Sequence, residues 1–511
     1  MILVWLLLIP FVAGALCYAL DSSRGQGASR WIALIGSGLI LLIALALWAT
    51  GNYHLTNAVQ GTAQWHTQFQ LEWIPSLGIS FHLALDGLSV IMLLLTGIMS
   101  VLAVASSWGQ PRNREGLFYA NLMWLIGGVV GIFLAIDLFA YFFFWEMMLI
   151  PMALLVALWG HDGSSVAAKR AAAIKFFIYT QASGLLMLAS IIGLVIVHYE
   201  QTGAVTFDYQ ALLQTSHGGA FGMVLMLGFF IAFATKLTTI PFHGWLPDFH
   251  THSPSDSSVD LTGVLVKTGA YGLLRFALPL FPHASAEFAP VAMILGLIGI
   301  YYGAVVAFAQ TDMKRFVGYT SIAHMGFVLI GIYAGTLLAV QGAILQLLAS
   351  ALSTAGLFLV SSQLYARLGT RDMRSLGGLF GLMGAMPGFA LVFSIAALGM
   401  PATANFLGEF LVLFGAFAHW PVIVAFAAAG LILAAVYALY LLHRVYWGPP
   451  SIKTPTSGLA SREYASLLLI VALTLIIGLY PASVLQVTTG TAHEIAHWFA
   501  GPVSAVSSSQ P

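Results

Sequence analysis

Five titratable residues of this sequence stand within long apolar stretches, where ionised side chains are costly and are functional candidates by default. They are Glu146, Lys236, Lys267, His324 and Glu409. Glu146 lies in AYFFFWEMMLIP, and each lysine lies near the middle of its own apolar run. Desolvation disfavours the charged form of a carboxyl or amine, so a small electrostatic change can load or unload its proton. The pattern indicates proton transfer inside a membrane protein.

These residues can be arranged into a sequence of proton steps. Lys236 is the expected ion-pair partner of Glu146, and moving the carboxyl would change the charge of the lysine. His324, in YTSIAHMGFV, could bridge Lys267 and Glu409, because imidazole titrates near neutral pH. Glu409 follows a Pro/Gly-rich stretch and could be the terminal proton donor or acceptor. The structural alternatives are a static ion pair at Glu146, a satisfied carboxyl at Glu409 and a hydrogen-bonded imidazole at His324.

Other polar residues have simpler interpretations. Arg275 and Lys175 lie nearer the ends of their apolar runs, where snorkelling or pairing is expected. Asp86 and Asp137 stand at run edges, where they are expected to cap helices or face water. A further cluster between Lys236 and Lys267 is expected to form hydrogen bonds or admit protons, because its spacing matches no strong metal template. Its members are His243, Asp248, His250 and His252.

The composition identifies the class of protein. Of the 511 residues, 60% are hydrophobic and 7% are charged, whereas soluble domains contain about 25% charged residues. Successive apolar runs match the roughly 20 residues that cross the hydrocarbon core. We therefore predict an all-α integral membrane protein with about fourteen spans. They are expected near 2–20, 31–50, 86–107, 116–136, 138–159, 171–198, 220–240, 257–281, 288–309, 316–335, 338–366, 385–417, 421–446 and 463–480.

Lys and Arg residues alternate between the connections of these spans. They follow spans 1, 3, 5, 9, 11 and 13, and the connections after even-numbered spans contain none. The positive-inside rule then places both termini on the side of the membrane opposite the cytoplasm. A net charge of zero indicates no nucleic-acid partner. The single cysteine, Cys17, excludes an internal disulfide and a cysteine-ligated cluster.

Some spans are expected to be broken. Pro241 follows Lys236 and Pro401 precedes Glu409, and proline interrupts a regular helix. Broken helices beside buried charge are a common construction of ion sites in transporters. Spans 4–8 and 9–13 form two blocks of five, and an odd number per block inverts the second block. The predicted regions are 1–115 with three spans and an interfacial loop, 116–281 as the first repeat, 282–447 as the second, and 448–511 with the last span and a tail.

The ends of the chain and its first long connection carry further expectations. The connection 52–83 contains Trp65 and Trp73 and is interpreted as an interfacial loop with aromatic anchors. The tail from His493 is expected to begin as a short amphipathic helix and to end in a flexible polar stretch.

Several stretches resemble the antiporter-like subunits of bacterial NADH–quinone oxidoreductase (respiratory complex I), the chain M group in particular. These are FLAIDLFAYFFFWEMMLIPM, KFFIYTQASGLLMLA, PFHGWLPDFH, VKTGAYGLLRF, FAQTDMKRFVGYTSIAHMGFVLIGIY and ALGMPATANFLGEFLVLFG. The resemblance covers nearly the whole chain. It implies fourteen helices with two inverted five-helix repeats.

The same resemblance implies roles for individual residues. The glutamate–lysine pair of the family falls on Glu146 and Lys236, the central lysine on Lys267, the relay histidine on His324 and the terminal glutamate on Glu409. The implied partners are neighbouring antiporter-like chains and membrane lipids. NADH, FMN, iron–sulfur clusters and quinone belong to other subunits, so no cofactor is expected in this chain.

Four positions depart from the family pattern. Members similar to this chain usually have histidine at Ser350, proline at Thr238, and alanine and glycine at Asp256 and Ser257. Ser350 removes one titratable step between Lys267 and Glu409, so water or a hydroxyl must serve there. Thr238 is expected to leave the seventh helix less sharply broken, and Asp256 adds an acid near the entrance of the loop.

The leading hypothesis is a proton-translocating subunit that couples quinone reduction elsewhere in the complex to pumping. A subunit of a multi-subunit cation/proton antiporter or of a membrane-bound hydrogenase is an alternative, because these share the fold and similar lysines. A non-pumping structural subunit with static charges is a second alternative. Protons are favoured over sodium ions because lysine and histidine cannot supply the oxygen ligands that hard cations prefer.

Overall fold

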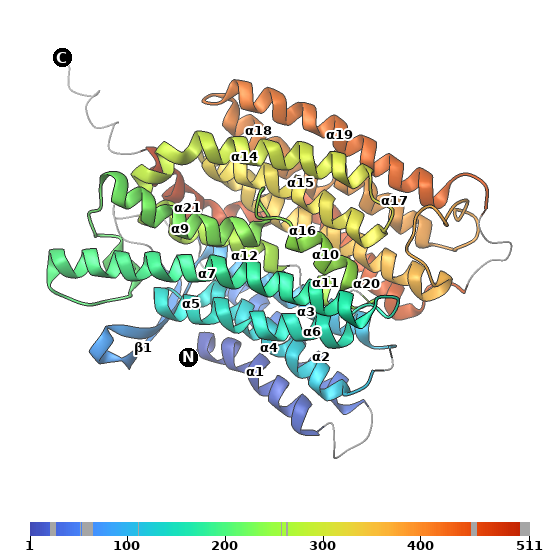
Figure 1. The fold of residues 1–511 in the computed structure, drawn as a ribbon, viewed down its shortest axis with the longest axis horizontal. Helices are drawn as coiled ribbons and strands as arrows, with labels where there is room; N and C mark the ends of the chain where they lie inside the picture. The colour runs from blue at the N-terminus through green and yellow to red at the C-terminus, as the bar shows by residue number, and fades with distance from the viewer. Residues whose placement is uncertain are drawn as a thin grey trace.

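The computed structural model describes residues 1–20, 27–51, 53, 65–110, 112–256, 258–261, 264–450 and 457–500. Long helices lie side by side along the horizontal axis of Figure 1, and the strand β1 projects at one end. Twelve helical segments of the described part are long and apolar enough to cross a membrane. They are α1 Ile2–Leu20, α2 Ala28–Thr50, α3 Gly87–Ser107, α4 Glu115–Leu134, α5 Leu138–Met147 continued by α6 Leu149–Trp159, α7 Val166–Thr202, α9 Gly219–Leu237, α14 Pro282–Phe308, α15 Met313–Tyr333, α16 Leu337–Leu368, α19 Pro421–Tyr446 and α20 Ser461–Leu479.

Shorter helices replace two of the predicted spans. The predicted eighth span, 257–281, is divided into α11 Ser258–Leu261, α12 Val264–Gly272, the π-helical turn η2 Leu273–Ala277 and α13 Leu278–Leu280. The predicted twelfth span is divided into α17 Met386–Ala397 and α18 Ala404–Phe417, so the predicted break around Pro401 is confirmed. The helix α10, Trp245–His252, lies in the polar connection after α9. The other described helices are α8 Tyr209–Leu212 and α21 Ala482–Ala500.

The interpretation of 52–83 as a loop is wrong for its described part. Residues Thr67–Ile74 (β1) and Ile79–Leu85 (β2) form an antiparallel hairpin, joined by the 3-10 turn η1 Pro75–Leu77. Thr67 lies opposite Leu85, and the register shifts between Glu72 and Ile74. Residues 52 and 54–64 lie outside the described part.

The expected short helix at the tail is also corrected. The helix α21 begins at Ala482, before the predicted start at His493, and continues to Ala500. It packs against α3 and α16, so contacts with the bundle support a helix whose composition is too polar for a membrane span. The expected flexible stretch, 501–511, lies outside the described residues, as do Arg24, Lys453 and Ser257.

Side chains at the ends of the helices define several boundaries. Asp86 accepts a hydrogen bond from Ser89 N at the start of α3, and Asp137 accepts from two backbone amides at the start of α5. Asp312 caps α15 in the same way. These contacts satisfy amides that have no partner within the first helical turn. The predicted capping by Asp86 and Asp137 is confirmed.

Two isolated backbone bridges have the same construction. Asp137 pairs with Asp208, and Asp312 pairs with Asp372. Each bridge joins the start of a capped helix to the segment after a long helix, α7 or α16, that ends at a glycine with positive φ. In the first bridge, Leu138 N donates to Phe207 O at 2.9 Å and Tyr209 N donates to Ile136 O at 3.1 Å. In the second, Met313 N donates to Arg371 O at 3.1 Å and Met373 N donates to Thr311 O at 2.8 Å.

The bridges lie at opposite ends of the bundle. The first contacts β2, because Ser80 N donates to Asp137, and we call this the hairpin end. The second contacts α10, because Arg371 donates to Thr251 O, and we call this the basic end. The 37 residues of α7 correspond to about 55 Å. This helix begins beside α10 and ends before Asp208, so it connects the two ends.

Thr238 ends α9 immediately after Leu237. Its φ is 61°, in the left-handed region, which is strained for a β-branched residue. The α-helix therefore stops abruptly although proline is absent at position 238. The expectation of a less sharp break than in proteins with proline at this position stays a prediction, and a left-handed residue ends the helix here.

We expect Thr238→Gly to stabilise the protein by about 1 kcal/mol, because glycine adopts positive φ without the Cβ clash. The measurement is the midpoint of thermal unfolding in detergent. Thr239→Gly is the matched control at a neighbouring buried position without positive φ, and it should lower the midpoint. A lower midpoint for Thr238→Gly than for the parent would contradict the strain argument.

Candidate functional site

Glu146 and Lys236 come from α5 and from the last turn of α9. The Lys236 side chain is fully buried, and its Nζ lies 5.3 Å from the ring centroid of Trp145 and 5.2 Å from that of Phe176. Glu146 interacts electrostatically with Lys236. Within the described part, however, neither Glu146 Oε1 nor Lys236 Nζ has a hydrogen-bond partner. The two groups are adjacent without the direct ion pair that we expected.

Gly184 provides the space that the Glu146 carboxylate occupies. This glycine lies on α7, and a Cβ at position 184 would overlap Glu146 Oε1. Gln181, one turn earlier on α7, interacts with the same carboxyl group. The orientation of Glu146 therefore depends on two residues of α7 that sequence reasoning did not identify.

Lys267 is buried on α12, with 2% of its surface exposed. No carboxylate of the described residues forms an ion pair with it. The helix α12 packs against α9, α15 and α16. Its close approach to α9 requires Gly269, because a Cβ there would overlap the backbone of Phe233 and Leu237. Lys267 therefore lies between the helix that carries Lys236 and the helix that carries His324.

His324 and Glu409 form the contact that the sequence predicted. His324 Nδ1 lies 3.0 Å from Glu409 Oε1, and Gln346 Nε2 donates to the same oxygen at 2.8 Å. All three side chains are buried, and His324 Nε2 has no partner among the described residues. A proton that reaches Nε2 could therefore be released from Nδ1 to the carboxylate. Gln346 was missed, although an amide within ILQLLAS was a detectable signal.

Ser350 does not connect these groups directly. Its hydroxyl donates to Leu347 O at 3.2 Å, within its own helix. A neighbouring hydroxyl, Ser353 Oγ, accepts from Asn405 Nδ2 at 3.3 Å and joins α16 to α18. The hydroxyls that could replace the expected histidine are therefore used in local contacts.

A second buried cluster lies at the basic end. Lys314, which the sequence placed in a connection, is fully buried in the first turn of α15. Its Nζ lies 2.6 Å from Asp260 Oδ2, 2.6 Å from Pro254 O and 3.1 Å from Ser253 Oγ. His250 Nδ1 lies 2.7 Å from Asp260 Oδ1. Neither Asp260 nor Lys314 was identified as a site residue from the sequence.

The other members of the His/Asp cluster point to different partners. Asp248 pairs with Lys175 at 2.6 Å and with Arg315 at 2.9 Å, so the predicted pairing of Lys175 is confirmed. His252 bonds Ser164, and the His243 ring packs against Tyr302. Within the described residues, no three His, Cys, Asp or Glu side chains are arranged to hold a metal ion.

Arg275 pairs with Asp86 at the hairpin end, which confirms its predicted pairing. Thr491 of α21 also donates to Asp86, at 2.8 Å, and the guanidinium lies 4.9 Å from the Trp65 ring centroid. Burial raises the pKa of Glu494, on α21, to about 7, although the charge of Arg275 opposes this shift. The cluster joins α3, α21 and the π-helical turn that follows Lys267.

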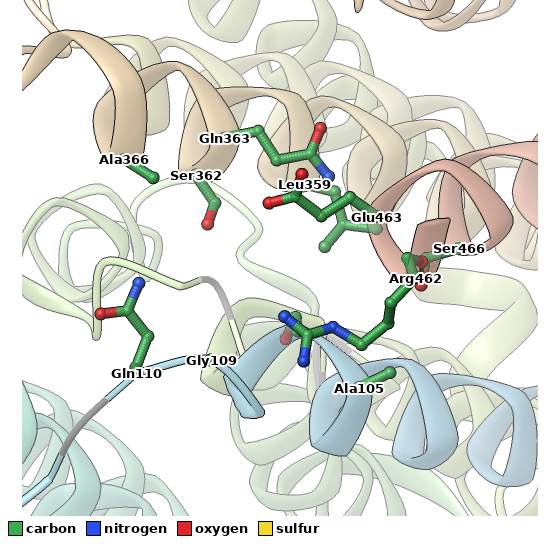
Figure 2. Close-up of a pocket in the computed structure, with 11 residues that line it drawn as sticks. Ala105, Gly109, Gln110, Leu359, Ser362, Gln363, Ala366, Arg462, Glu463 and Ser466 are labelled. Atoms are coloured by element: carbon green, nitrogen blue, oxygen red, sulfur yellow. Dashed lines mark hydrogen bonds between the residues drawn. The ribbon is translucent and has the colours of Figure 1, made fainter. Parts of the chain in front are cut away.

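Two cavities open at the basic end. Figure 2 shows the first, where side chains of α3, α16 and α20 face one space of about 260 Å³. It is lined by Ala105, Ser106, Gly109, Gln110, Leu359, Ser362, Gln363, Ala366, Arg462, Glu463 and Ser466. The second, of about 230 Å³, is lined by Gln110, Arg112, Asn113, Leu158, Trp159, Gly160, Asp162, Lys169, Pro254, Ser255 and Asp256. Asp256 also pairs with Arg112, and its expected position near the entrance of the loop stays a prediction.

Comparison with known proteins identifies the family. The family model described as NADH:quinone oxidoreductase/Mrp antiporter, TM matches residues 135–434. Subunit M of NADH-quinone oxidoreductase from Escherichia coli (strain K12) is 53% identical over 507 residues, which cover 99% of both chains. The chain belongs to the subunit M family of NADH-quinone oxidoreductase. The predicted family is therefore confirmed, and so is its class as a multi-pass membrane subunit of a respiratory translocase.

Solved structures agree with this family assignment. A chain of respiratory complex I from Thermus thermophilus with bound NADH matches with a TM-score of 0.86 and 31% identity, over 98% of this chain and 100% of that chain. A chain of the Mrp complex from Dietzia sp. DQ12-45-1b matches with a TM-score of 0.80 and 24% identity, over 97% of this chain and 52% of that chain. The Mrp match is a likeness of fold alone, whereas the subunit M family is shown by sequence.

His161, which bonds a residue of the second cavity, is expected to make the stability of the protein depend on pH. It lies between α6 and α7, and its Nδ1 is 2.8 Å from Ser255 Oγ. Burial lowers the pKa of His161 to about 3, and the charge of Arg371 acts in the same direction. Between about pH 3 and about pH 6.5, His161 binds a proton in the unfolded chain but not in the folded chain. This group therefore destabilises the fold as pH falls below about 6.5.

We expect His161→Gln to weaken the fall in stability between pH 7.5 and pH 5, because glutamine keeps a hydrogen bond but cannot bind the proton. The measurement is the thermal unfolding midpoint in detergent at both pH values. His283→Gln replaces an exposed histidine of α14 and is the matched control. An unchanged pH dependence in His161→Gln would contradict this assignment.

Proposed function

We propose that the chain translocates protons in the membrane arm of NADH:quinone oxidoreductase and couples quinone reduction in other subunits to pumping. The proposed route uses Glu146, Lys236, Lys267, His324 and Glu409. The observation that carries this proposal is the adjacency of Glu146 and Lys236, which are partly and fully buried without a direct bond between them. A carboxyl and an amine in that state can respond to a small electrostatic change, whereas a closed ion pair is stable.

Interrupted helices support the same route. Lys236 is the penultimate residue of α9, and Glu409 lies in the second turn of α18 after the break that follows α17. Irregular backbone at membrane depth is tolerated where protein or a water-filled cavity satisfies its polar groups. Both breaks therefore lie next to residues that the proposal assigns to proton movement.

We propose fourteen spans with two inverted five-span repeats, 116–281 and 282–447, flanked by 1–115 and 448–511. The twelve long segments and the two divided ones add up to this number. The matching bridges, Asp137 with Asp208 and Asp312 with Asp372, support the duplication. Their positions at opposite ends of the bundle support the inversion.

The basic end is proposed to face the cytoplasm, following the positive-inside rule. Arg30 at the start of α2 bonds Glu115 at the start of α4, so α1 ends and α2 begins at the basic end. The chain therefore starts at the hairpin end, where α21 also contacts Asp86 through Thr491. This arrangement supports periplasmic N- and C-termini.

Partners are proposed to cover the outer helices. In α2, α19 and α20 a third or less of the most apolar membrane-spanning residues is buried. In α15 and α16 all of these residues are buried. Neighbouring antiporter-like chains and lipids of the bacterial inner membrane fit these exposed apolar faces. NADH, FMN, iron–sulfur clusters and quinone are proposed to bind other subunits. The 53% identity to subunit M favours this function over that of a cation/proton antiporter subunit.

Glu146→Gln tests the proposed function. We expect NADH-driven proton uptake by inverted membrane vesicles to fall by roughly tenfold or more, because a proton-transfer group is lost. NADH–ferricyanide reductase activity measures assembly of the complex. Glu287→Gln, at an exposed carboxyl of α14, is the matched control. Proton uptake at the parent level in Glu146→Gln would show that this carboxyl does not couple.

Gly184→Ala tests the position of the carboxylate without removing a titratable group. The added methyl would overlap Glu146 Oε1, so we expect proton uptake per assembled complex to fall severalfold. Gly193→Ala lies on the same helix, but its methyl would meet the flexible end of Leu225, so it should have little effect. Equal uptake in the two variants would count against a requirement for this carboxylate position.

A further inference from the structure

The Lys314–Asp260 cluster is not used by the proposed route. Both side chains are buried, and they join α15 to the short helix α11 at the basic end. The ammonium has three acceptors, namely Asp260, Pro254 O and Ser253 Oγ. An ammonium has three donors, so all the donors of Lys314 are used and its side chain is held in place. Asp260 is held in turn by Ser253, at 2.7 Å, and by His250.

The cluster lies directly behind the wall of the 230 Å³ cavity. Pro254 lines this cavity, and its carbonyl oxygen accepts from Lys314 Nζ. Asp162 and Lys169 line the same space, and a polar space of this size is suited to hold water. A single residue, Pro254, therefore separates this polar cavity at the basic end from the buried ion pair.

The ion pair also lies before the two central residues of the proposed route. Asp260 is seven residues before Lys267, and Lys314 is ten residues before His324 on the same helix. The helix α12, which carries Lys267, packs against α15. The Lys314–Asp260 pair therefore joins the segment before Lys267 to the segment before His324. It lies next to the 230 Å³ cavity.

We propose that the Lys314–Asp260 pair is a charged gate between this cavity and Lys267, an inference that rests on the proposed function. When the pair is closed, the fixed ammonium repels protons that approach from the cavity, as fixed cations do in other selective pores. The carboxylate of Asp260 keeps the ammonium in place. The gate opens when Asp260 is protonated, because the ionic contact with Lys314 is then lost.

The transfer through the gate balances in atoms and charge. A hydronium ion in the cavity gives up one proton and becomes water, as an O–H bond forms at the Asp260 carboxylate. That O–H bond then breaks, and the proton passes through water that links the two groups to form an N–H bond on the neutral amine of Lys267. Asp260 is again a carboxylate, and its contact with Lys314 closes behind the proton. His250 and Ser253 are positioning residues that orient Asp260.

The test is the double variant Asp260→Asn/Lys314→Met in the complete complex. Removing both members of a buried ion pair leaves no unpaired charge and is often tolerated, whereas removing one member is strongly destabilising. For the gate, we expect normal NADH–ferricyanide activity but a loss of roughly tenfold or more in NADH-driven proton uptake by inverted vesicles. Arg374→Gln/Asp372→Asn removes an exposed pair at the same end and is the matched control.

The other outcomes are equally informative. If the double variant assembles and transports protons at the parent level, the pair is a static structural contact and the gate is refuted. If it does not assemble, Ser253→Ala decides, because this change removes one hydroxyl from both partners and keeps both charges. A severalfold loss of uptake per assembled complex then supports the gate, and parent-level uptake overturns it.

Lys267→Ala, measured in parallel, separates the two proposals. If Lys267→Ala loses proton uptake and the double variant does not, only the gate is wrong. If Lys267→Ala keeps parent-level uptake, the proposed route itself is wrong, and the gate is wrong with it.

Discussion

The free-energy cost of keeping a charge away from water governs this structure. Two buried ion pairs, Arg275 with Asp86 and Lys314 with Asp260, meet this cost with direct contacts and further hydrogen bonds. Lys236 has no hydrogen-bond partner among the described residues and is bordered by aromatic rings. The bundle therefore contains charges that are held by direct contacts and a charge that has no such contact, and the protonation state of the second kind responds more easily to its surroundings.

The same constraint applies to the broken backbone. Where α9 stops, Trp245 donates its indole N–H to Thr235 O at 2.9 Å, and Thr239 N donates to Ala234 O at 2.9 Å. These bonds satisfy carbonyls that a continuous helix would have used. These bonds stabilise the irregular segment without a water molecule at each of these groups, and the helix ends just after Lys236, the residue that the proposed route requires.

The sequence was sufficient for features that depend on hydrophobicity over a long window. The predicted spans 2–20, 138–159 and 421–446 coincide with α1, with α5 and α6, and with α19. Lone charges such as Glu146 were conspicuous against apolar neighbours. The hairpin at Thr67–Leu85 was missed because its short strands alternate polar and apolar residues and produce no span signal.

Long-range polar partners could not be predicted for a different reason. Lys314 stands beside Arg315 near the end of a span, which is the usual position of a solvated basic residue. Its partner Asp260 is 54 residues away, and no local pattern reports such a contact. Gln346 was missed because an uncharged amide gives a weaker signal than a charge. Buried polar pairs such as Lys314 with Asp260 were therefore harder to predict than lone charges in apolar runs, because tertiary contacts define the pairs.

The two matching bridges show how one scaffold can hold different chemistry. Glu146 lies nine residues after Asp137, and the residue nine positions after Asp312 is Ser321. His324 lies one helical turn further along α15, where it contacts Glu409. The first half therefore presents a carboxyl that responds to a neighbouring amine, and the second presents an imidazole in contact with a carboxylate. Under the duplication that we propose, this difference arises from side-chain type and a shift of one turn.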